Sequence, residues 1–353
     1  RHRVPRHRRA VGSRGAWWKV KATLQARMPS TPTLSDIQAP IRDRLSEAAE
    51  ALKRIVTSEL PLIDAVNGHL LLMKGKMFRP TLVLLASEVA GRPEPRAATL
   101  AATVELVHLA TLVHDDSVDH STLRRGMPTV NSLFTHQVSV IMGDFLYSRA
   151  MVELVRTRDI EILGVLADAT NEMTIGEMRQ LTALDALAFT EDDYEALIRA
   201  KTASLLSAAC EIGALGGGGE YREPLARYGK WLGMAFQVAD DLLDYTADAA
   251  MLGKPSGLDL REHKVTLPLI AALRSMTRAA RSEVDELFAT TEPSDEQIEE
   301  VVAIVEEAGG LDYAARRADE YALAAEAALD GLPETPILSA LHDAIAYSVQ
   351  RSH

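Results

Sequence analysis

The sequence predicts an all-α protein, built as a single large bundle of helices around a central core. Ala and Leu dominate the 353 residues and aromatic residues make up only 5%, a bias that favours helix over strand. Apolar residues recur at steps of three and four along much of the chain, as they do in amphipathic helices. There is no sustained alternation of apolar and polar residues of the kind that indicates a sheet.

Residues 29–353 are predicted to form one domain, because no shift in composition marks a linker within them. Hydrophobic residues make up 47% of the chain, which is enough for a large core. Thr190 is a predicted helix N-cap, and Ser294 opens a predicted capping box with Gln297. We expect helices over residues 34–56, 80–91, 190–215 and 294–309, and one long buried helix over residues 96–125, which contain no Gly or Pro.

The first 27 residues differ from the rest of the chain in charge. They hold nine Lys and Arg and no acid, whereas the whole chain has a net charge of −12. Three interpretations stay open: sequence upstream of a start at Met28, an organelle transit peptide, or a basic arm for anionic surfaces. We therefore assign residues 1–28 to a basic N-terminal extension that is disordered or not part of the mature protein. The expected location is cytoplasmic, or organellar if the extension is a transit peptide.

Charge, cysteine content and hydropathy argue against several classes of protein. The negative net charge argues against a general nucleic-acid binder. Cys210 is the single cysteine, so no intrachain disulfide can form, which fits a reducing compartment. No uninterrupted apolar run reaches ~18 residues, so we expect no transmembrane segment.

An unusual concentration of acidic residues, HDDSVD, follows an apolar run at residues 114–119. On a helix, Asp115 and Asp119 lie one turn apart on nearly the same face, with Asp116 to one side. A solvated helix face is the ordinary explanation, but the preceding residues are apolar on most sides and predict a buried helix. The same D-D-x-x-D spacing recurs 125 residues later in DDLLDY, at Asp240, Asp241 and Asp244.

The recurrence of the motif suggests a metal site. If the two helices face each other, six carboxylates converge, and they repel one another unless cations lie between them. Oxygen ligands without cysteine favour Mg²⁺, which keeps several waters and binds together with substrate phosphates. The pair of motifs therefore predicts a metal-bridged phosphate or diphosphate site.

Such a site needs basic and polar groups to hold phosphate oxygens, and short motifs near the aspartates supply them. A lone Lys or Arg is ordinarily a solubilising surface charge, and a lone His is often a core residue, so each motif alone is a weak signal. Together they match the need for several cations around two diphosphates. The candidates are Lys76, Arg79, His108, Arg124, Arg125, Lys201, Thr202, Gln237, Lys254 and Lys264.

These motifs resemble those of the trans-isoprenyl diphosphate synthases, the polyprenyl synthetase family, and most of all its long-chain members. The stretches GKMFRP, ELVHLATLVHDDSVD, LRRGMPTVN, GDFLYSRA, AKTASLL, AFQVADDLLDY and DLREHKVTLPLI occur in the family's order. They span residues 75–270, and helical sequence on both sides extends the resemblance over residues 29–353. The resemblance implies a prenyltransferase domain, with helices around a central cavity as in isoprenoid synthases, and a homodimer.

The resemblance also implies roles for the candidate residues. It places two or three Mg²⁺ ions, or Mn²⁺, between Asp115, Asp116 and Asp119, which face an allylic diphosphate, and Asp240, Asp241 and Asp244 on the opposite wall. Lys76, Arg79, His108 and Arg125 match positions that bind isopentenyl diphosphate. Arg124, Lys201, Thr202, Gln237, Lys254 and, as a less certain match, Lys264 belong to the allylic side. Arg124 and Lys201 join the six aspartates as the expected catalytic residues.

Two stretches depart from the family's pattern. Lys74 and Met77 stand where the family usually has a second glycine and an extra arginine, but Lys76 and Arg79 keep their spacing, so we retain that site. His263 stands where a glycine is common before the next lysine, and its effect on the loop is open.

The implied activity is that of an all-trans polyprenyl diphosphate synthase. Mg²⁺ makes the allylic diphosphate a good leaving group, the C–O bond ionises, isopentenyl diphosphate attacks the cation, and a proton is lost. Repeated cycles give a long-chain product for quinone side chains or other isoprenoids. The tail is expected to descend beside the helix of Asp115, where Val107, Ala110 and Thr111 are small enough to leave room, unless Ala110 merely packs against a neighbouring helix. The greasy product favours peripheral contact with a membrane.

Other functions compete with this interpretation. The product could be shorter, as in a geranylgeranyl or farnesyl diphosphate synthase, or the chain could be the catalytic subunit of a heteromeric synthase. A terpene cyclase of the same fold is disfavoured, because such enzymes usually replace the second aspartate motif. The basic motifs argue against a simple acidic cation-binding protein.

Overall fold

The computed structural model describes residues 32–73, 75–182, 186–246 and 257–350, so the predicted extension over residues 1–28 and the candidate Lys254 lie outside the described residues. Within that part the protein is almost entirely helical, as predicted, with one two-stranded ladder. The elements are α2 (Leu34–Gln38), η1 (Ala39–Ile41), α3 (Arg42–Val56), α4 (Pro61–Leu72), α5 (Phe78–Glu88), α6 (Ala97–Val118), β1 (Leu123–Arg124), β2 (Met127–Pro128), α7 (Val130–Leu133), α8 (His136–Thr157), α9 (Ile160–Thr182), η2 (Ala186–Ala188), α10 (Glu191–Ile198), the π-helix η3 (Arg199–Ala203), α11 (Ser204–Leu215), α12 (Arg222–Thr246), α14 (Leu258–Arg261), α15 (Leu267–Leu273), α16 (Arg278–Ala289), α17 (Asp295–Glu307), α18 (Gly310–Ala328) and α19 (Pro336–Val349).

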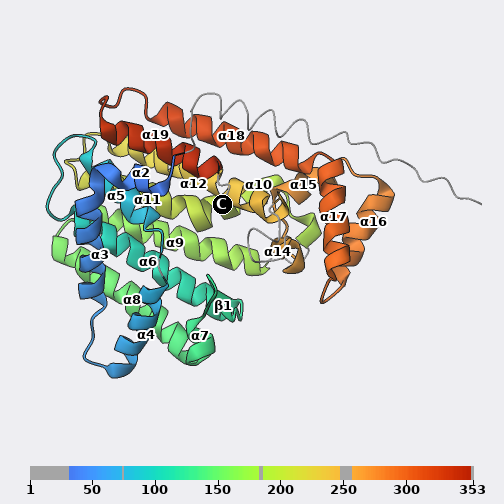
Figure 1. The fold of residues 1–353 in the computed structure, drawn as a ribbon, viewed down its shortest axis with the longest axis horizontal. Coiled ribbons are helices and arrows are strands. Elements are labelled where there is room, and N and C mark those ends of the chain that lie inside the picture. Colours follow the sequence, from blue (N-terminus) through green and yellow to red (C-terminus); the bar gives the residue numbers. More distant parts are fainter. Residues whose placement is uncertain (1–31, 74, 183–185, 247–256, 351–353) are drawn as a thin grey trace, which may run out of the picture.

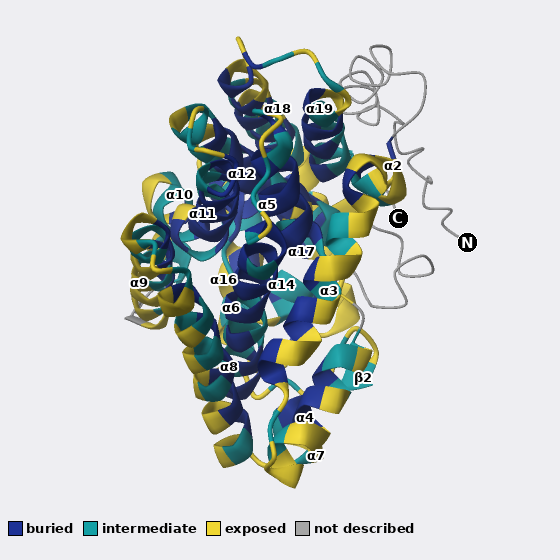
Figure 2. Cartoon of the chain, turned by 90° about the vertical axis from the view of Figure 1, so that its left-hand side faces the viewer, coloured by how far each residue is buried: buried dark blue, intermediate teal, exposed yellow. Residues whose placement is uncertain are grey.

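The centre of the bundle is formed by α6, α11, α12 and α18 (Figure 1). Helix α6 packs against α3, α5 and α8, while α11 packs against α5, α9 and α12, and α18 lies along α12. Their contact side chains are fully buried, among them Leu84, Leu100, Leu206 and Leu232. Figure 2 shows the same layering, with α5, α11 and α12 largely buried and exposed positions concentrated on outer helices such as α9. The helices that carry both aspartate motifs are therefore held in the core.

A smaller core lies beneath α14 to α17, at the right-hand end of Figure 1. Tyr245 from the end of α12 and Leu260 from α14 pack there against Val284, Ile298 and Val301. This packing attaches the segment that follows the second aspartate motif to the α16–α17 pair.

The long helix predicted over residues 96–125 is shorter than expected. Helix α6 ends at Val118, and strands β1 and β2 then form a short antiparallel hairpin. Its turn residues Arg125 and Gly126 both have positive φ, at 52° and 75°, the conformation that two-residue hairpin turns require. Arginine is not a usual residue at such a position, so no hairpin was predicted here from the sequence.

Local signals at the other helix ends agree better with the structure. Thr190 and Ser294 are N-caps with complete capping boxes, as predicted. The helix expected over residues 34–56 is interrupted by η1, which contains Pro40, so it forms as α2 and α3. The helix expected after Thr190 runs through α10, η3 and α11, with a π-helical turn in its middle.

One described helix, α6, is long and apolar enough to cross a membrane by length and composition alone. Two-thirds of the residues in its most apolar window are buried inside the protein, as in the core helix of a folded bundle.

Close helix packing depends on a few glycines. A Cβ added at Gly213 of α11 would lie 2.2 Å from the carbonyl oxygen of Val83 and 2.7 Å from Cβ of Ala86, both on α5. A Cβ added at Gly164 of α9 would meet no other atom within 4 Å. Gly213 therefore sets the distance between α5 and α11, whereas Gly164 has no such constraint.

We predict that Gly213→Ala lowers the free energy of unfolding by about 1–3 kcal/mol, since the added methyl group forces two backbones apart. The matched control, Gly164→Ala, should leave that free energy unchanged or raise it by up to about 1 kcal/mol, through better helix propensity. Urea unfolding followed by circular dichroism measures both. Equal stabilities for the two variants would contradict the packing role of Gly213.

Candidate active site

The first aspartate motif lies at the C-terminal end of α6. Asp116 is buried, and Nε of Arg124 donates to its two carboxylate oxygens at 2.9 and 2.8 Å. The β1–β2 hairpin is what brings Arg124 back onto α6, so the turn at Arg125 and Gly126 is part of the site. Asp115 is partly buried, and Asp119 is the exposed C-cap residue of the helix.

The electrostatic environment of Asp115 is set by α9 and the π-helix. Burial, followed by the carboxylates of Glu177 and Asp119, raises the pKa of Asp115 to about 6, although Lys201 and Arg124 act in the opposite direction. Nζ of Lys201 lies 2.6 Å from Oε1 of Glu177 and donates to Gln180 at 2.9 Å. The prediction that Lys201 lies beside the first aspartate motif agrees with this geometry.

The second aspartate motif lies at the C-terminal end of α12. Asp241 is buried and accepts two hydrogen bonds, from the Tyr194 hydroxyl at 2.5 Å and from Nε2 of Gln237 at 2.9 Å. The carboxylate of Asp244 accepts from the backbone N–H groups of Leu258 and Asp259, both at 3.0 Å. Asp240 is exposed.

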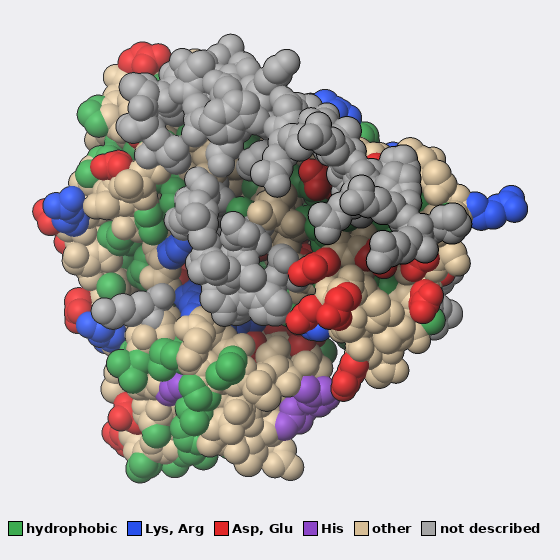
Figure 3. All heavy atoms as spheres, turned by 45° about the vertical axis from the view of Figure 1, so that its right-hand side comes forward, with side chains coloured by type: hydrophobic (Ala, Val, Ile, Leu, Met, Phe, Trp, Pro, Cys, Tyr) green, Lys and Arg blue, Asp and Glu red, His purple; other side chains and the backbone are tan. Residues whose placement is uncertain are grey.

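Carboxylates gather around the second motif, and Figure 3 shows a concentration of acidic side chains on the right-hand part of the face drawn there. Burial and then Asp259 raise the pKa of Asp241 well above its ordinary value, although its hydrogen bonds act to lower it. Burial and then Asp244 raise the pKa of Asp259 to about 7, against the effect of Lys264. Burial also raises the pKa of Asp244.

Two segments, the π-helix η3 and the stretch around Lys264, connect the surroundings of the two aspartate motifs, which we call the two walls of the site. Thr202 in the π-helix donates to Oε1 of Gln237 at 2.8 Å, so the turn that carries Lys201 towards Asp115 also reaches the Asp241 wall. Burial lowers the pKa of Lys264, but Glu262, Asp259 and Asp119 together raise it above its ordinary value. Lys264 therefore senses Asp119 of the first motif directly, and it reaches the second motif only through Asp259, whose own pKa is raised by Asp244.

A second group of basic residues surrounds His108 of α6, which lies two turns before Asp115; Arg79 comes from α5 and Arg125 from the turn of the β1–β2 hairpin. Burial, then Arg79 and Arg125, lowers the pKa of His108 well below its ordinary value, so the ring is neutral at neutral pH. Glu105 is buried among the same arginines; burial raises its pKa, while Arg79 and Arg125 act to lower it. Lys76 is exposed, and its Nζ lies 3.2 Å from the Tyr347 hydroxyl on α19.

A cavity of about 630 Å³ opens beside the first motif. Asp115, Asp119 and Lys201 lie at its polar end, and its walls are formed by α6, α8 and α9. All three of the residues expected to set product length line it: Val107, Ala110 and Thr111. Its volume lies within the ordinary range for small-molecule sites.

The residues of the two walls fit Mg²⁺. Among the described residues, no three His, Cys, Asp or Glu side chains form a preassembled metal site. This suits an ion that takes one or two carboxylates and completes its shell with waters and substrate phosphates. The donors are carboxylate oxygens at the negative ends of two helix dipoles. Burial first, and neighbouring carboxylates after it, raise the pKa values of Asp115, Asp244 and Asp259, and a divalent cation would favour their charged forms.

Comparison with known proteins decides the family. The family model described as polyprenyl synthetase matches residues 61–305. The chain belongs to the polyprenyl synthetase family. It is 42% identical to an all-trans-nonaprenyl-diphosphate synthase (geranyl-diphosphate specific) of Rhodobacter capsulatus, over 87% of this chain and 94% of that protein. It is 35% identical to a short chain isoprenyl diphosphate synthase of Methanothermobacter thermautotrophicus, over 91% and 100%.

Solved structures agree with this assignment. A polyprenyl synthase from Caulobacter crescentus, complexed with calcium and isoprenyl diphosphate, superposes with a TM-score of 0.86 at 33% identity, covering 91% of this chain and 99% of that one. The predicted family, all-α fold and prenyltransferase activity are therefore confirmed. The family is in general Mg²⁺-dependent.

Some residues of the site were missed when the sequence was considered alone. Glu105 was not among the predicted site residues, yet it is buried beside Arg79 and Arg125. Glu177 and Tyr194 lie on helices whose patterning is ordinary, so nothing local marks them. Asp259 lies 15 residues after Asp244, too far along the chain to predict that the two are neighbours. The chain folds back through α14, and the backbone N–H of Asp259 donates to the Asp244 carboxylate.

We predict that Arg124→Met lowers the free energy of unfolding by about 1.5–3 kcal/mol, because it leaves the buried Asp116 without its charged partner. Arg278→Met is the control: this arginine is exposed at the start of α16, so the loss should stay within about 0.5 kcal/mol. Both free energies are measured by urea unfolding. A loss as large in Arg278→Met as in Arg124→Met would contradict the role of Arg124 as the partner of Asp116.

Proposed function

We propose that the protein is an Mg²⁺-dependent all-trans polyprenyl diphosphate synthase with a long-chain product. It would condense an allylic diphosphate with isopentenyl diphosphate in repeated cycles of ionisation, condensation and elimination. The observation that carries the proposal is the cavity of about 630 Å³ with acidic residues at one end and Val107, Ala110 and Thr111 along its wall. An anionic head held at Asp115 would direct an apolar tail into this space.

The six aspartates would hold the metal ions, two or three Mg²⁺ or alternatively Mn²⁺, from opposite walls. Bound Mg²⁺ would neutralise the charge of the allylic diphosphate and make it a better leaving group. Asp116 and Asp241 each accept hydrogen bonds from neighbouring side chains, so they also fix the orientation of their motifs. Lys201 and Arg124 would add positive charge beside the same diphosphate.

Isopentenyl diphosphate would bind beside Arg79, Arg125, His108 and Lys76. Guanidinium groups suit paired phosphate oxygens, and a neutral His108 offers a hydrogen bond without a change of charge. Thr202, Gln237 and Lys264 would support the allylic side, together with Lys254, which lies outside the described residues. The departing diphosphate is the proposed acceptor of the proton lost in each cycle.

The names of relatives support a long product but leave a second option. The relative at 42% identity is named for a nonaprenyl product, and one at 35% is named as a short chain synthase. A geranylgeranyl or farnesyl diphosphate synthase, or a catalytic subunit that needs a second protein, is therefore the alternative. A homodimer, a cytoplasmic or organellar location and peripheral membrane contact remain expectations.

The proposal is tested by incubating the purified chain with Mg²⁺, isopentenyl diphosphate and farnesyl diphosphate, and measuring product length by chromatography. We expect products longer than geranylgeranyl diphosphate. In the same assay Asp115→Ala should lower turnover about a thousandfold, since metal stabilisation is worth several kcal/mol and each ~1.4 kcal/mol is tenfold. Asp285→Ala, which changes an aspartate on the outer helix α16, is the control and should keep full activity.

The outcomes separate the alternatives. A product no longer than geranylgeranyl diphosphate would favour the short-chain alternative, and no product without a second protein would favour the heteromeric one. Retained turnover in Asp115→Ala, with an unchanged circular dichroism spectrum, would remove Asp115 from the site.

We predict that Ala110→Phe shortens the main product, because the larger ring would fill the cavity one turn below Asp115. Ala110→Ser, which keeps the volume small, is the control and should leave product length unchanged. Chromatography of the dephosphorylated products measures both. An unchanged chain length in Ala110→Phe would mean that the tail does not follow this wall.

A further inference from the structure

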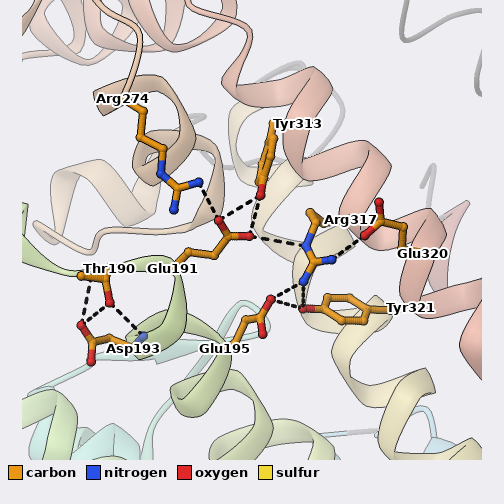
Figure 4. Close-up of polar contacts among 9 residues, drawn as sticks. All are labelled: Thr190, Glu191, Asp193, Glu195, Arg274, Tyr313, Arg317, Glu320 and Tyr321. Atoms are coloured by element: carbon orange, nitrogen blue, oxygen red, sulfur yellow. Dashed lines mark hydrogen bonds and ion pairs between the residues drawn. The ribbon is translucent and has the colours of Figure 1, made fainter.

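Helix α10 is held on one side by a group of charged and aromatic residues, which we call the Arg317 cluster: Glu191 and Glu195 on α10, Arg274 at the end of α15, and Tyr313, Arg317, Glu320 and Tyr321 on α18 (Figure 4). The Tyr313 hydroxyl donates to both carboxylate oxygens of Glu191, at 2.8 and 2.9 Å. Nη1 of Arg274 lies 2.8 Å from the same carboxylate.

The second acid of α10 makes a similar set of contacts one turn later. Glu195 accepts from the Tyr321 hydroxyl at 2.6 Å and from Nη2 of Arg317. Nε of Arg317 also lies 3.4 Å from Glu191, so one guanidinium joins both acids. Glu191 and Glu195 lie at i and i+4, on one face of α10, and that face is fixed to α15 and α18.

The adjacent face of α10 carries Tyr194, which is only 2% exposed. Its hydroxyl donates to Oδ2 of Asp241, while Gln237 donates to Oδ1. Gln237 in turn accepts from Thr202, in the π-helix that follows α10 without a break. One continuous helical segment therefore reaches Asp241 at both oxygens, directly through Tyr194 and indirectly through Thr202.

Tyr194 is not among the residues that line the cavity, so it does not contact a tail bound there. We propose that Tyr194 is a positioning residue of the reaction, which fixes the Asp241 carboxylate at the second metal wall, and that the Arg317 cluster holds α10 in the register this contact needs. The inference rests on the proposed function, because it assigns Asp241 to the metal–diphosphate site.

The physical reason is that a buried carboxylate with two fixed donors has one orientation. Without the hydroxyl, Oδ2 of Asp241 would keep no donor from α10, and the carboxylate could turn towards Gln237 alone. Residues that orient metal ligands through hydrogen bonds typically change metal affinity or activity 10- to 100-fold when they are mutated. The Arg317 cluster would act through the same contact, because its acids lie three residues before and one residue after Tyr194 on the same short helix.

The first experiment compares Tyr194→Phe with Tyr228→Phe. Tyr228 is a second fully buried tyrosine, and its hydroxyl donates to the Leu341 carbonyl at 2.9 Å, away from the aspartates. Both variants lose one buried hydrogen bond, so both should lose similar stability, but only Tyr194 contacts Asp241. Calorimetric titration with inorganic pyrophosphate, with and without Mg²⁺, gives a readout that does not depend on turnover.

We expect Tyr194→Phe to weaken Mg²⁺-dependent pyrophosphate binding about 10- to 100-fold and to raise KM for the allylic diphosphate. KM for isopentenyl diphosphate should stay unchanged, since its basic group lies on α5, α6 and the β1–β2 hairpin. Tyr228→Phe should bind pyrophosphate as the unmodified protein does. Unchanged binding in Tyr194→Phe, or an equal loss in Tyr228→Phe, would overturn the positioning role.

The second experiment tests the Arg317 cluster with Glu191→Gln and Glu320→Gln. Each removes one carboxylate from Arg317, but Glu320 lies on the same helix as Arg317 and does not reach α10. Glu191→Gln should weaken Mg²⁺-dependent pyrophosphate binding at least about threefold, and Glu320→Gln should leave it unchanged. In a Tyr194→Phe background Glu191→Gln should add little, because both changes act through one contact.

The results distinguish this inference from the proposed function. Full additivity of Glu191→Gln and Tyr194→Phe, or an equal effect of Glu320→Gln, would overturn the role of the Arg317 cluster. If the unmodified protein formed no prenyl product, the proposed function would fail. If it formed product and bound pyrophosphate with Mg²⁺, but Tyr194→Phe did so equally well, only this inference would fail.

Discussion

Helices α6 and α12 each carry three aspartates at the C-terminal end, and neighbouring groups offset part of the repulsion among these carboxylates. Each helix end already carries partial negative charge from its dipole, so the carboxylates add to an unfavourable potential. The protein relieves part of it internally, through Arg124 on Asp116, backbone N–H groups on Asp244 and hydroxyl and amide donors on Asp241. The repulsion that remains would be offset by the Mg²⁺–diphosphate complex of the proposed function.

Irregular backbone concentrates where that compensation is needed. The tight turn of the β1–β2 hairpin returns Arg124 to α6, and the short helix α14 returns two N–H groups to α12. The π-helix carries Lys201 on the side of Asp115 and Thr202 on the side of Gln237. Rigid long helices supply the carboxylates, and short irregular segments between them supply the partners.

Sequence patterning was sufficient for the fold class, because helical periodicity depends on local spacing and composition; the roles of the aspartate motifs and of the basic residues stay predictions. Sequence patterning failed where a contact forms only because a later segment folds back onto an earlier helix. The hairpin after Val118 was missed because Arg125 adopts positive φ without a glycine or asparagine signal. Glu105, Glu177 and Asp259 gain their significance from neighbours distant in the sequence, and a periodic pattern carries no information about those.

Under the proposed function, helix α6 would couple the chemistry to the product length. Asp115 lies at its C-terminal end, and Ala110 and Val107, which line the same cavity, lie one to two turns earlier. These side chains share one helix, so the distance from a diphosphate held at Asp115 to a bulky side chain further along would be fixed by the helical rise, about 1.5 Å per residue. Such length control would need no moving part, because the size of a side chain at a given turn of α6 would set how far a tail extends before it meets the cavity wall.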